Sequence, residues 1–413
     1  MSDPASAIGR DTATALRDGF LRTSRSAQVP NHLLITNGLF DLDKIYGIYD
    51  DAGVEYRRYP IAPWRAVCTE HQIADTPRNV TWQPPARLDH YIFNMADGYL
   101  QRVLPWHLFR IRDGFVSYDI TRPGQPEFYF FTAGGEAING LFFGGQPFLE
   151  DPGWQVETPC VFADDFFVRF NICHLLFDKL PRIHTAQTLA GAQTALLFSA
   201  PGYVADLCGL FGITAVAPPP GRRRGTIALR DCLIFSDSFN GLKHPGRFGG
   251  PRHLDTLAAL RAALPPALDG PKRYFLHREP PLPRVIENAA AVARILDRHG
   301  FHTGDPAALA PLDQMRMFLN VEMLGGVHGA GLANLAFQSP GSTVIELLPP
   351  LCATRAYWAM SQKTGLDYHH LVCDDPELGT VNARAQVHDV RNNRRNVVVP
   401  EAAFEALLAG LDA

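Results

Sequence analysis

The sequence predicts an α/β protein built on Rossmann-type sheets, preceded by an irregular stretch that leans towards β-structure. Strand and helix patterns alternate from about residue 194 to residue 372, which is typical of parallel sheets. One predicted strand, at 325–328, runs into closely spaced glycines and then a helical turn, as strands do at the ligand-binding edge of such sheets. The length of 413 residues allows two domains, and 46% hydrophobic with 19% charged residues is ordinary for a globular chain.

The N-terminal part of the chain has the least regular pattern. Between about residues 31 and 151, short aromatic runs such as Phe128–Thr132 are separated by glycine and proline, which predicts irregular strands and loops. We therefore treat residues 1–150 as a partly β N-terminal extension without an assigned role.

The middle of the chain begins the alternation of strands and helices. The expected elements are a strand (194–199), a helix ended by Gly212 (203–211), a strand or strand pair (227–235) and a helix (253–264). Prolines and a glycine make 265–271 the clearest linker. These limits predict a first Rossmann-like domain at 151–265.

The last third of the chain alternates more regularly. In the predicted helix 284–299, apolar residues recur at a spacing of three to four until Gly300 ends the helix. The expected elements are a strand (273–277), two helices (284–299, 311–320), a strand (325–328), a helical turn (332–337), a strand (343–348), a helix (354–364) and a strand (368–372). This pattern predicts a second Rossmann-like domain at 266–375, followed by a tail at 376–413 with a helix that packs back.

Charge, cysteine content and hydropathy exclude several classes of protein. The formal net charge of −4 gives no overall attraction for nucleic acid or an anionic membrane, so no nucleic-acid partner is expected. Seven cysteines without CxxC pairs favour a reducing, cytoplasmic location. Residues 1–30 lack the apolar core of a signal peptide, and glycine and proline interrupt the most apolar stretch, 194–216, so no transmembrane segment is predicted.

The sharpest motif is the run GGVHGAGLAN at 325–334. A strand that leads into glycines and a helix brings backbone N–H groups and a helix N-terminus to one point, where such sheets bind phosphate. The alternative is a tight packing turn with a structural histidine. We predict ligand-binding roles for His328, Gly329, Ala330, Gly331 and Asn334.

Glu346 and two arginines extend this candidate site. Glu346 lies in the apolar strand 343–348, where an unpaired carboxylate is costly and a ribose diol is a natural partner; a strand-end glutamate turned to solvent is the alternative. Arg278 follows the strand 273–277 and Arg284 opens the next helix, so their guanidinium groups bracket a loop in a way that suits a pyrophosphate. As isolated arginines they would be solvated surface charges.

His174 and Asp178 form a candidate catalytic pair in the apolar segment 166–183. A helix that begins near Asn171 would place them one turn apart on the same face. The carboxylate could then set the tautomer of the imidazole and raise its basicity, which would make His174 a general base. A histidine satisfied within an apolar core is the alternative.

No metal site is predicted. Asp41-Leu42-Asp43 is the only Asp-x-Asp sequence, and it is typical of a helix N-cap. The adjacent His369 and His370 would point to opposite faces of a strand, which is poor geometry for one metal ion.

Together these residues resemble glycosyltransferase family 61, in particular bacterial members that make capsular polysaccharide and exopolysaccharide. The family signature G-x-H-G-A-G-L-x-N-L, followed by an I-E-L strand, is matched at 326–335 and 345–347. The family segment N-x-x-H-W-x-x-D-x-L-P-R is similar to 171–182, with Leu175 in place of the tryptophan. An arginine pair, an asparagine-bearing helix and a preceding glutamine are similar to Arg278, Arg284, Asn288 and Gln314.

The resemblance implies a GT-B architecture, in which two Rossmann-like domains face a cleft and bind the acceptor and the nucleotide sugar respectively. It also implies an inverting, metal-independent transfer from a nucleoside diphosphate, with UDP expected, to a hydroxyl of a glycan acceptor in polysaccharide biosynthesis. The nucleotide sugar is then a co-substrate, no cofactor is expected, and peripheral contact with a membrane-bound acceptor is compatible with the prediction. Residues 1–150 lie outside the resemblance.

Two other classes of function stay open at this point. A non-catalytic nucleotide- or glycan-binding module would keep the same fold without activity. A hydrolase is the other alternative, because the sequence at 328–331 superficially resembles the oxyanion-hole segment of esterases, but no serine of the chain lies in a G-x-S-x-G sequence.

Overall fold

The computed structural model divides the chain into two compact units that interleave along the sequence. The described residues are 35–36, 39–40, 42–51, 53, 55–67, 69–73, 106–121, 126–143, 146–164, 172–198, 202–235, 251–350, 352, 356–377 and 395–412. The first unit comprises Met1–Ala74, Pro105–Phe170 and Arg182–Lys243, and the second Asp75–Leu104, Asn171–Pro181 and His244–Ala413. The predicted residues Asp41 and Asn171 lie outside the described residues.

The first unit is built on a ten-stranded mixed sheet of order β11-β10-β9-β12-β5-β6-β7-β3, with β4 beside β5 and β8 beside β12. Its strands are β3 (Ile61–Pro63), β4 (Thr69–Ile73), β5 (Trp106–Asp119), β6 (Glu127–Thr132), β7 (Ala137–Phe143), β8 (Trp154–Val156), β9 (Cys160–Phe162), β10 (Thr194–Leu196), β11 (Thr214–Val216) and β12 (Arg224–Phe235). A separate two-stranded sheet joins β1 (Ile35–Thr36) to β2 (Leu39–Phe40), and the helices are α2 (Leu42–Asp51), α3 (Trp64–Val67), α5 (Leu180–Ala190) and α6 (Gly202–Leu210).

Strand β12 joins two parts of the chain that the sequence analysis kept apart. It pairs in parallel with β9 on one side and antiparallel with β5 on the other. The boundary predicted between residues 150 and 151 therefore divides a single sheet, because β5 supplies the antiparallel partner along the whole length of β12. Only the parallel strands β9, β10 and β11, connected by helices, follow the Rossmann-type pattern expected for 151–265.

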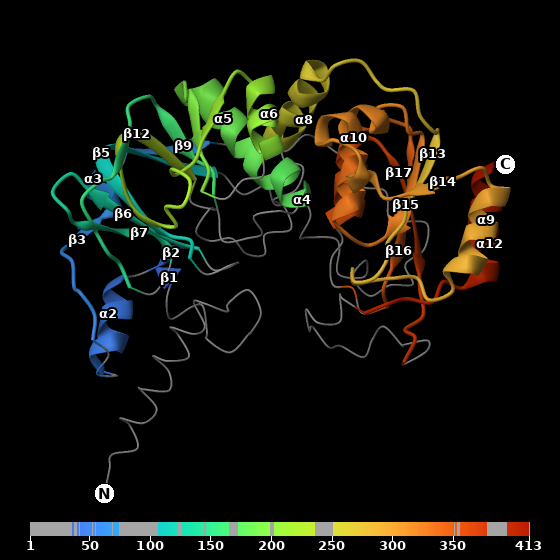
Figure 1. Ribbon diagram of the computed structural model, residues 1–413, viewed down its shortest axis with the longest axis horizontal. Coiled ribbons are helices and arrows are strands. Elements are labelled where there is room, and N and C mark those ends of the chain that lie inside the picture. The colour runs from blue at the N-terminus through green and yellow to red at the C-terminus, as the bar shows by residue number, and fades with distance from the viewer. Residues whose placement is uncertain are drawn as a thin grey trace, which may run out of the picture. The chain divides into compact units, whose positions relative to one another are not determined.

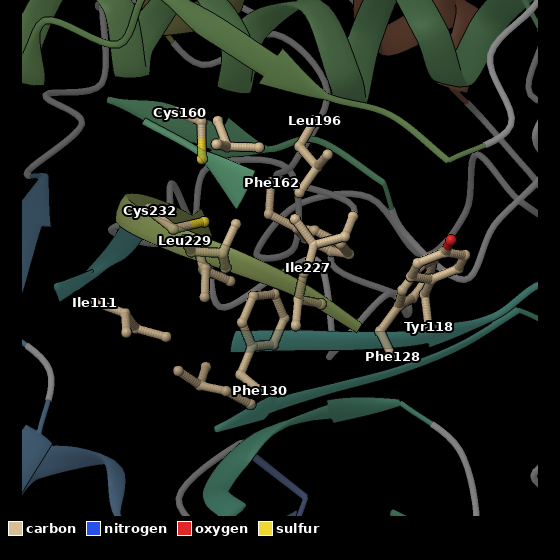
Figure 2. Close-up of a cluster of buried hydrophobic side chains, with 14 of the residues drawn as sticks. Ile111, Tyr118, Phe128, Phe130, Cys160, Phe162, Leu196, Ile227, Leu229 and Cys232 are labelled. Carbon is tan, nitrogen blue, oxygen red and sulfur yellow. The ribbon is translucent and has the colours of Figure 1, made fainter. Parts of the chain in front are cut away.

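Figure 2 shows the main apolar core of this unit, where side chains from several strands meet. The ring of Phe162 on β9 lies edge-on to two rings of β6, with centroid distances of 5.0 Å to Phe128 and 5.1 Å to Phe130. Leu196 and Ile227 bring β10 and β12 into the same cluster. The predicted aromatic run 128–132 lies in strand β6, whose pairing with β7 has a register shift between Tyr129 and Phe131, and alternate side chains of the run fill this shared core.

The second unit has a five-stranded, fully parallel sheet of order β14-β13-β15-β16-β17. Its strands are β13 (Arg273–Leu276), β14 (His302–Gly304), β15 (Met323–Val327), β16 (Thr343–Leu348) and β17 (Asp367–Val372). The helical elements are α4 (Ile172–His174), the π-helical turn η3 (Leu175–Lys179), α8 (Pro251–Ala263), α9 (Ala289–Arg298), the 3-10 helices η4 (Pro306–Ala308) and η5 (Ala330–Phe337), α10 (Pro311–Phe318), α11 (Ala356–Thr364) and α12 (Glu401–Asp412).

The strand order of this sheet locates its ligand-binding edge. Counted along the chain it is 2-1-3-4-5, the flavodoxin-like order of doubly wound sheets, whose topological switch point lies between the first and third strands. Here these strands are β13 and β15. The predicted α/β alternation of the last third is confirmed, and α12, the expected C-terminal helix, lies beside α9 (Figure 1) and adds Phe404 and Leu408 to the core.

Helix α9 begins five residues later than predicted. Arg284 has a left-handed backbone, with φ of 68°, which a helix cannot continue through. After it, Glu287 donates its N–H to the Val397 carbonyl at 2.9 Å, and Val397 donates to the Val285 carbonyl at 3.0 Å. Because this segment is extended against the residues that precede α12, the helix starts only after Asn288, whose side-chain amide is bound to the backbone of Val399.

Candidate functional site

The candidate site lies at the switch point, where β13 and β15 end side by side. Leu276 of β13 is in register with Gly326 of β15, so the loops that follow the two strands leave the sheet at the same edge. Arg278 is the second residue after β13, and His328 and Gly329 follow β15 directly. The structure thus brings together the first arginine and the glycine motif of the sequence prediction.

Glycines in the motif make room for side chains of the neighbouring strand. A Cβ on Gly325 would lie 2.8 Å from Cδ2 of Phe275, and a Cβ on Gly326 would lie 2.9 Å from Cβ of Leu276. A Cβ on Gly329 would lie 1.9 Å from an Nη atom of Arg278. Gly329 has φ of 167°, an extended backbone that any residue adopts, so this glycine is needed for space. The Arg278 guanidinium occupies that space.

Arg278 is a half-buried cation beside a second arginine. Its Nη1 donates to the Pro283 carbonyl at 3.2 Å, and no ion pair joins it to a carboxylate of the described residues. Burial lowers the pKa of Arg278, and the nearby Arg284 guanidinium lowers it further. Because arginine stays protonated even so, Arg278 keeps a positive charge that a bound anion would neutralise.

The backbone of Arg284 is strained. Its φ of 68° is rare for a residue with a long side chain and costs of the order of 1–3 kcal/mol, a strain that clusters at ligand-binding sites. The extended segment that follows, bound to Val397, holds Arg284 in this conformation beside Arg278.

A buried hydrogen-bond network fixes the orientation of His328. Its Nδ1 lies 2.5 Å from Oε1 of Glu346, and the Tyr368 hydroxyl donates to Oε2 of the same carboxylate at 2.5 Å. Glu346 is only 1% exposed. Since both carboxylate oxygens have protein partners, Glu346 acts on the site through His328, whereas the sequence prediction gave it a ribose diol.

The same network favours the protonated form of His328. Burial lowers its pKa, but contacts with the Cys352 thiol and the Glu346 carboxylate outweigh burial and raise the pKa to about 10. An imidazolium would place a further positive charge at the end of β15, directly before Gly329, which the Arg278 guanidinium approaches.

Tyr357 of α11 supports the loop that follows β15. Its hydroxyl donates to the Gly329 carbonyl at 2.6 Å, and its ring centroid lies 5.4 Å from that of His328. Burial raises the pKa of Tyr357 well above its usual value, and contact with the Cys173 thiol raises it further. The hydroxyl therefore stays protonated and available as a donor.

The remaining residues of the glycine motif shape η5. Ala330 and Gly331 are its first two residues, so their N–H groups have no acceptor within the helix itself. Asn334 is fully buried, and its amide donates to the Gly331 carbonyl at 2.9 Å. In this arrangement Asn334 stabilises the turn, and direct contact with a ligand stays a prediction.

The segment that carries His174 and Asp178 belongs to the second unit, although the sequence analysis assigned it to the first predicted domain. His174 ends α4 and is half-buried, and α4 packs on η5. Asp178 follows within η3, and its side chain lies outside the described residues. The π-helical turn η3 is wider than an α-helical turn, since the Leu180 N–H donates to the Leu175 carbonyl five residues earlier. Pro181 follows directly and has no N–H to donate to the Phe177 carbonyl.

Three residues of the network were missed by sequence reasoning: Cys352, Tyr357 and Tyr368. Tyr368 could have been found, because His370 is in register with Glu346, and a residue two positions away on the same strand shares its face of the sheet. Tyr357 and Cys352 reach the site by tertiary packing, which no periodicity of the chain signals.

Two absences concern only the described part of the chain. Within it, no group of three or more His, Cys, Asp or Glu side chains could hold a metal ion. Its helices also include none that is long and apolar enough to cross a membrane.

Arginines that face a glycine loop at the switch point of a doubly wound sheet are typical of a site for a phosphorylated ligand. The family model described as glycosyltransferase 61 matches residues 172–345, which contain α4, the arginine pair and the glycine motif. The chain is therefore a glycosyltransferase, and its residues 172–345 are similar to glycosyltransferase family 61.

Two solved structures are similar to the chain at 10% identity. One is the iron-containing dodecameric glycosyltransferase TibC from enterotoxigenic E. coli H10407, matched over 74% of this chain and 94% of that chain with a TM-score of 0.31. The other is the dodecameric iron-containing heptosyltransferase TibC in complex with ADP-D-beta-D-heptose, matched over 82% and 99% with a TM-score of 0.33. No curated protein matches the chain.

Proposed function

We propose that this glycosyltransferase transfers a sugar from a nucleoside diphosphate, UDP in our proposal, to a glycan hydroxyl with inversion at the anomeric carbon. The acceptor class we propose is a growing polysaccharide. A GT-B arrangement, with the first unit taking part in acceptor binding, belongs to the same proposal, as does a cytoplasmic location.

One observation carries the assignment of the donor site. Arg278 lies in the space left by Gly329 at the switch point, next to Arg284 and without an ion pair to a described carboxylate. Two guanidinium groups offer paired donors that match the oxygens of a diphosphate. A bound diphosphate would supply the negative charge that Arg278 lacks among the described carboxylates, and this supports a nucleoside diphosphate as ligand.

The reaction requires stabilisation of a leaving group that gains negative charge as the glycosidic bond breaks. Arg278, Arg284 and the His328 imidazolium would supply fixed positive charge at that point, together with the N–H groups of Gly329, Ala330 and Gly331. Glu346 would keep the imidazole oriented and charged. In this proposal no divalent cation is needed.

Inversion also requires a base that removes the proton of the attacking hydroxyl. We assign this role to His174, with Asp178 one helical turn further along the same helical segment as its orienting carboxylate. The packing of α4 on η5 supports the assignment, because it brings the His174 helix next to the donor loop.

Calorimetry with UDP tests the donor site. Arg278→Ala should weaken UDP binding at least about tenfold, which is the loss expected for charge-assisted hydrogen bonds to phosphate. Arg294→Ala, at an exposed position of α9, is the matched control and should leave UDP affinity unchanged. Equal affinities of the two variants would mean that the diphosphate does not bind at Arg278. UDP binding without turnover of any nucleotide sugar would instead indicate a non-catalytic binding module.

A further inference from the structure

Tyr357 lies at a junction within the second unit. It is the second residue of α11, and its hydroxyl donates to the Gly329 carbonyl at 2.6 Å. The same carbonyl accepts from the Leu332 N–H at 3.0 Å. The Gly329 peptide, against which the Arg278 guanidinium lies, is therefore held by two donors.

The hydroxyl of Tyr357 also reaches the helix that carries the candidate base. It contacts the Cys173 thiol of α4, the residue directly before His174. A phenolic hydroxyl can donate one hydrogen bond and accept another, so it can donate to Gly329 while it accepts from Cys173. Successive helical residues point about 100° apart, which leaves His174 on an adjoining side of the helix.

The surroundings of Tyr357 keep this hydroxyl protonated. Burial and the Cys173 contact raise its pKa, Glu346 raises it further, and Arg284 acts in the opposite direction. A phenolate could not donate to a carbonyl oxygen, so the raised pKa preserves the bond to Gly329.

We propose that Tyr357 is a positioning residue, which links helix α4 to the loop between β15 and η5. This inference rests on the proposed function, because the link matters for transfer only if the loop binds the donor and α4 presents the base. Through one hydroxyl, the peptide that supports Arg278 and the residue next to His174 are held together. Donor binding at the loop would then fix the position of the base.

A pair of tyrosine-to-phenylalanine variants tests this link. Tyr357→Phe removes the hydroxyl and keeps the ring, and Tyr274→Phe is the matched control, because Tyr274 is also 3% exposed and lies in β13 of the same unit. Without ligand, amide hydrogen exchange in 172–177 and 329–337 should speed up together about threefold or more in Tyr357→Phe, as expected when one hydrogen bond is lost. The control should match the wild-type protein in both segments. Unchanged exchange at 172–177 in Tyr357→Phe would overturn the link.

A second measurement shows whether the link serves the reaction. In the wild-type protein, UDP should slow amide hydrogen exchange in both segments, 329–337 and 172–177. In Tyr357→Phe, UDP should slow amide hydrogen exchange in 329–337 only. Turnover of the nucleotide sugar that the wild-type protein hydrolyses fastest should fall about three- to tenfold in Tyr357→Phe, with UDP affinity kept. Cys173→Ala should add little to that loss, since both variants break the same connection. Losses that multiply in the double variant would contradict a shared connection.

The outcomes separate this proposal from the donor-site proposal. If Arg278→Ala leaves UDP affinity unchanged, the donor site is wrong, and the ligand-free exchange still decides whether Tyr357 links α4 to the loop. If Arg278→Ala weakens UDP binding while Tyr357→Phe behaves like Tyr274→Phe, only the positioning role of Tyr357 is wrong.

Discussion

The imidazole of His328 is bound through Nδ1 to the carboxylate of Glu346, 2.5 Å away, in a network that Tyr368 completes on the other carboxylate oxygen. Burial of a carboxylate costs little free energy when both of its oxygens accept hydrogen bonds. Burial of the Glu346 carboxylate or of the His328 imidazolium without the other would destabilise the folded protein. Because Nδ1 is held by Glu346, Nε2 on the opposite side of the ring is the atom that a ligand would meet.

The pH dependence of stability reports the charge on His328. Its pKa in the folded protein, about 10, is above the value of about 6.5 expected in the unfolded chain. The stabilisation is therefore complete below about pH 6.5 and is lost as pH rises to about 10. The difference in melting temperature between the wild-type protein and His328→Asn should be largest at about pH 6 and shrink towards about pH 10. His302→Asn, at an exposed site, is the control, and a constant difference for His328→Asn would exclude the raised pKa.

Alanine substitution at Gly329 and at Gly325 should affect different properties of the protein, UDP affinity in the first case and stability in the second. In Gly329→Ala the new methyl group meets the flexible end of Arg278, so the guanidinium moves, stability changes little, and UDP affinity falls about tenfold or more. In Gly325→Ala the methyl group meets the buried ring of Phe275, and overpacking should cost about 1–3 kcal/mol of unfolding free energy. Urea unfolding and UDP calorimetry on both variants measure the contrast. A stability loss in Gly329→Ala with unchanged affinity would assign the glycine to packing alone.

The sequence predicted the second sheet well and the first sheet poorly, for different reasons. Strand β16 has the predicted limits because a buried parallel strand is a continuous apolar run between turn residues. Each residue of β12 that pairs with β5 is separated from its partner by more than a hundred residues of chain, and pairing of that kind leaves no local periodicity to read. Arg278, Gly329 and His328 were predicted as ligand-binding residues because motifs are local. The bonds of Glu346 were not predicted, since they depend on which side chains neighbouring strands bring together.

Substitution of His174 by alanine should lower turnover without lowering UDP affinity. Removal of a general base should lower turnover about a hundredfold or more, while UDP affinity survives because the diphosphate is held at Arg278. His184→Ala, further along the same run of helix in α5, is a matched control that should retain activity. Release of UDP from a nucleotide sugar measures turnover. Full activity of His174→Ala would mean that another group takes the proton.

Removal of divalent metal tests how the leaving diphosphate is stabilised. With two guanidinium groups and an imidazolium supplying the positive charge, turnover in excess EDTA should stay within about twofold of turnover in Mg²⁺. Arg278→Lys keeps the charge but loses the paired donors, so it should lower turnover in both buffers alike. Activity that EDTA abolishes and Mg²⁺ or Mn²⁺ restores would contradict the proposal, and it would show that a metal ion shares the diphosphate with Arg278.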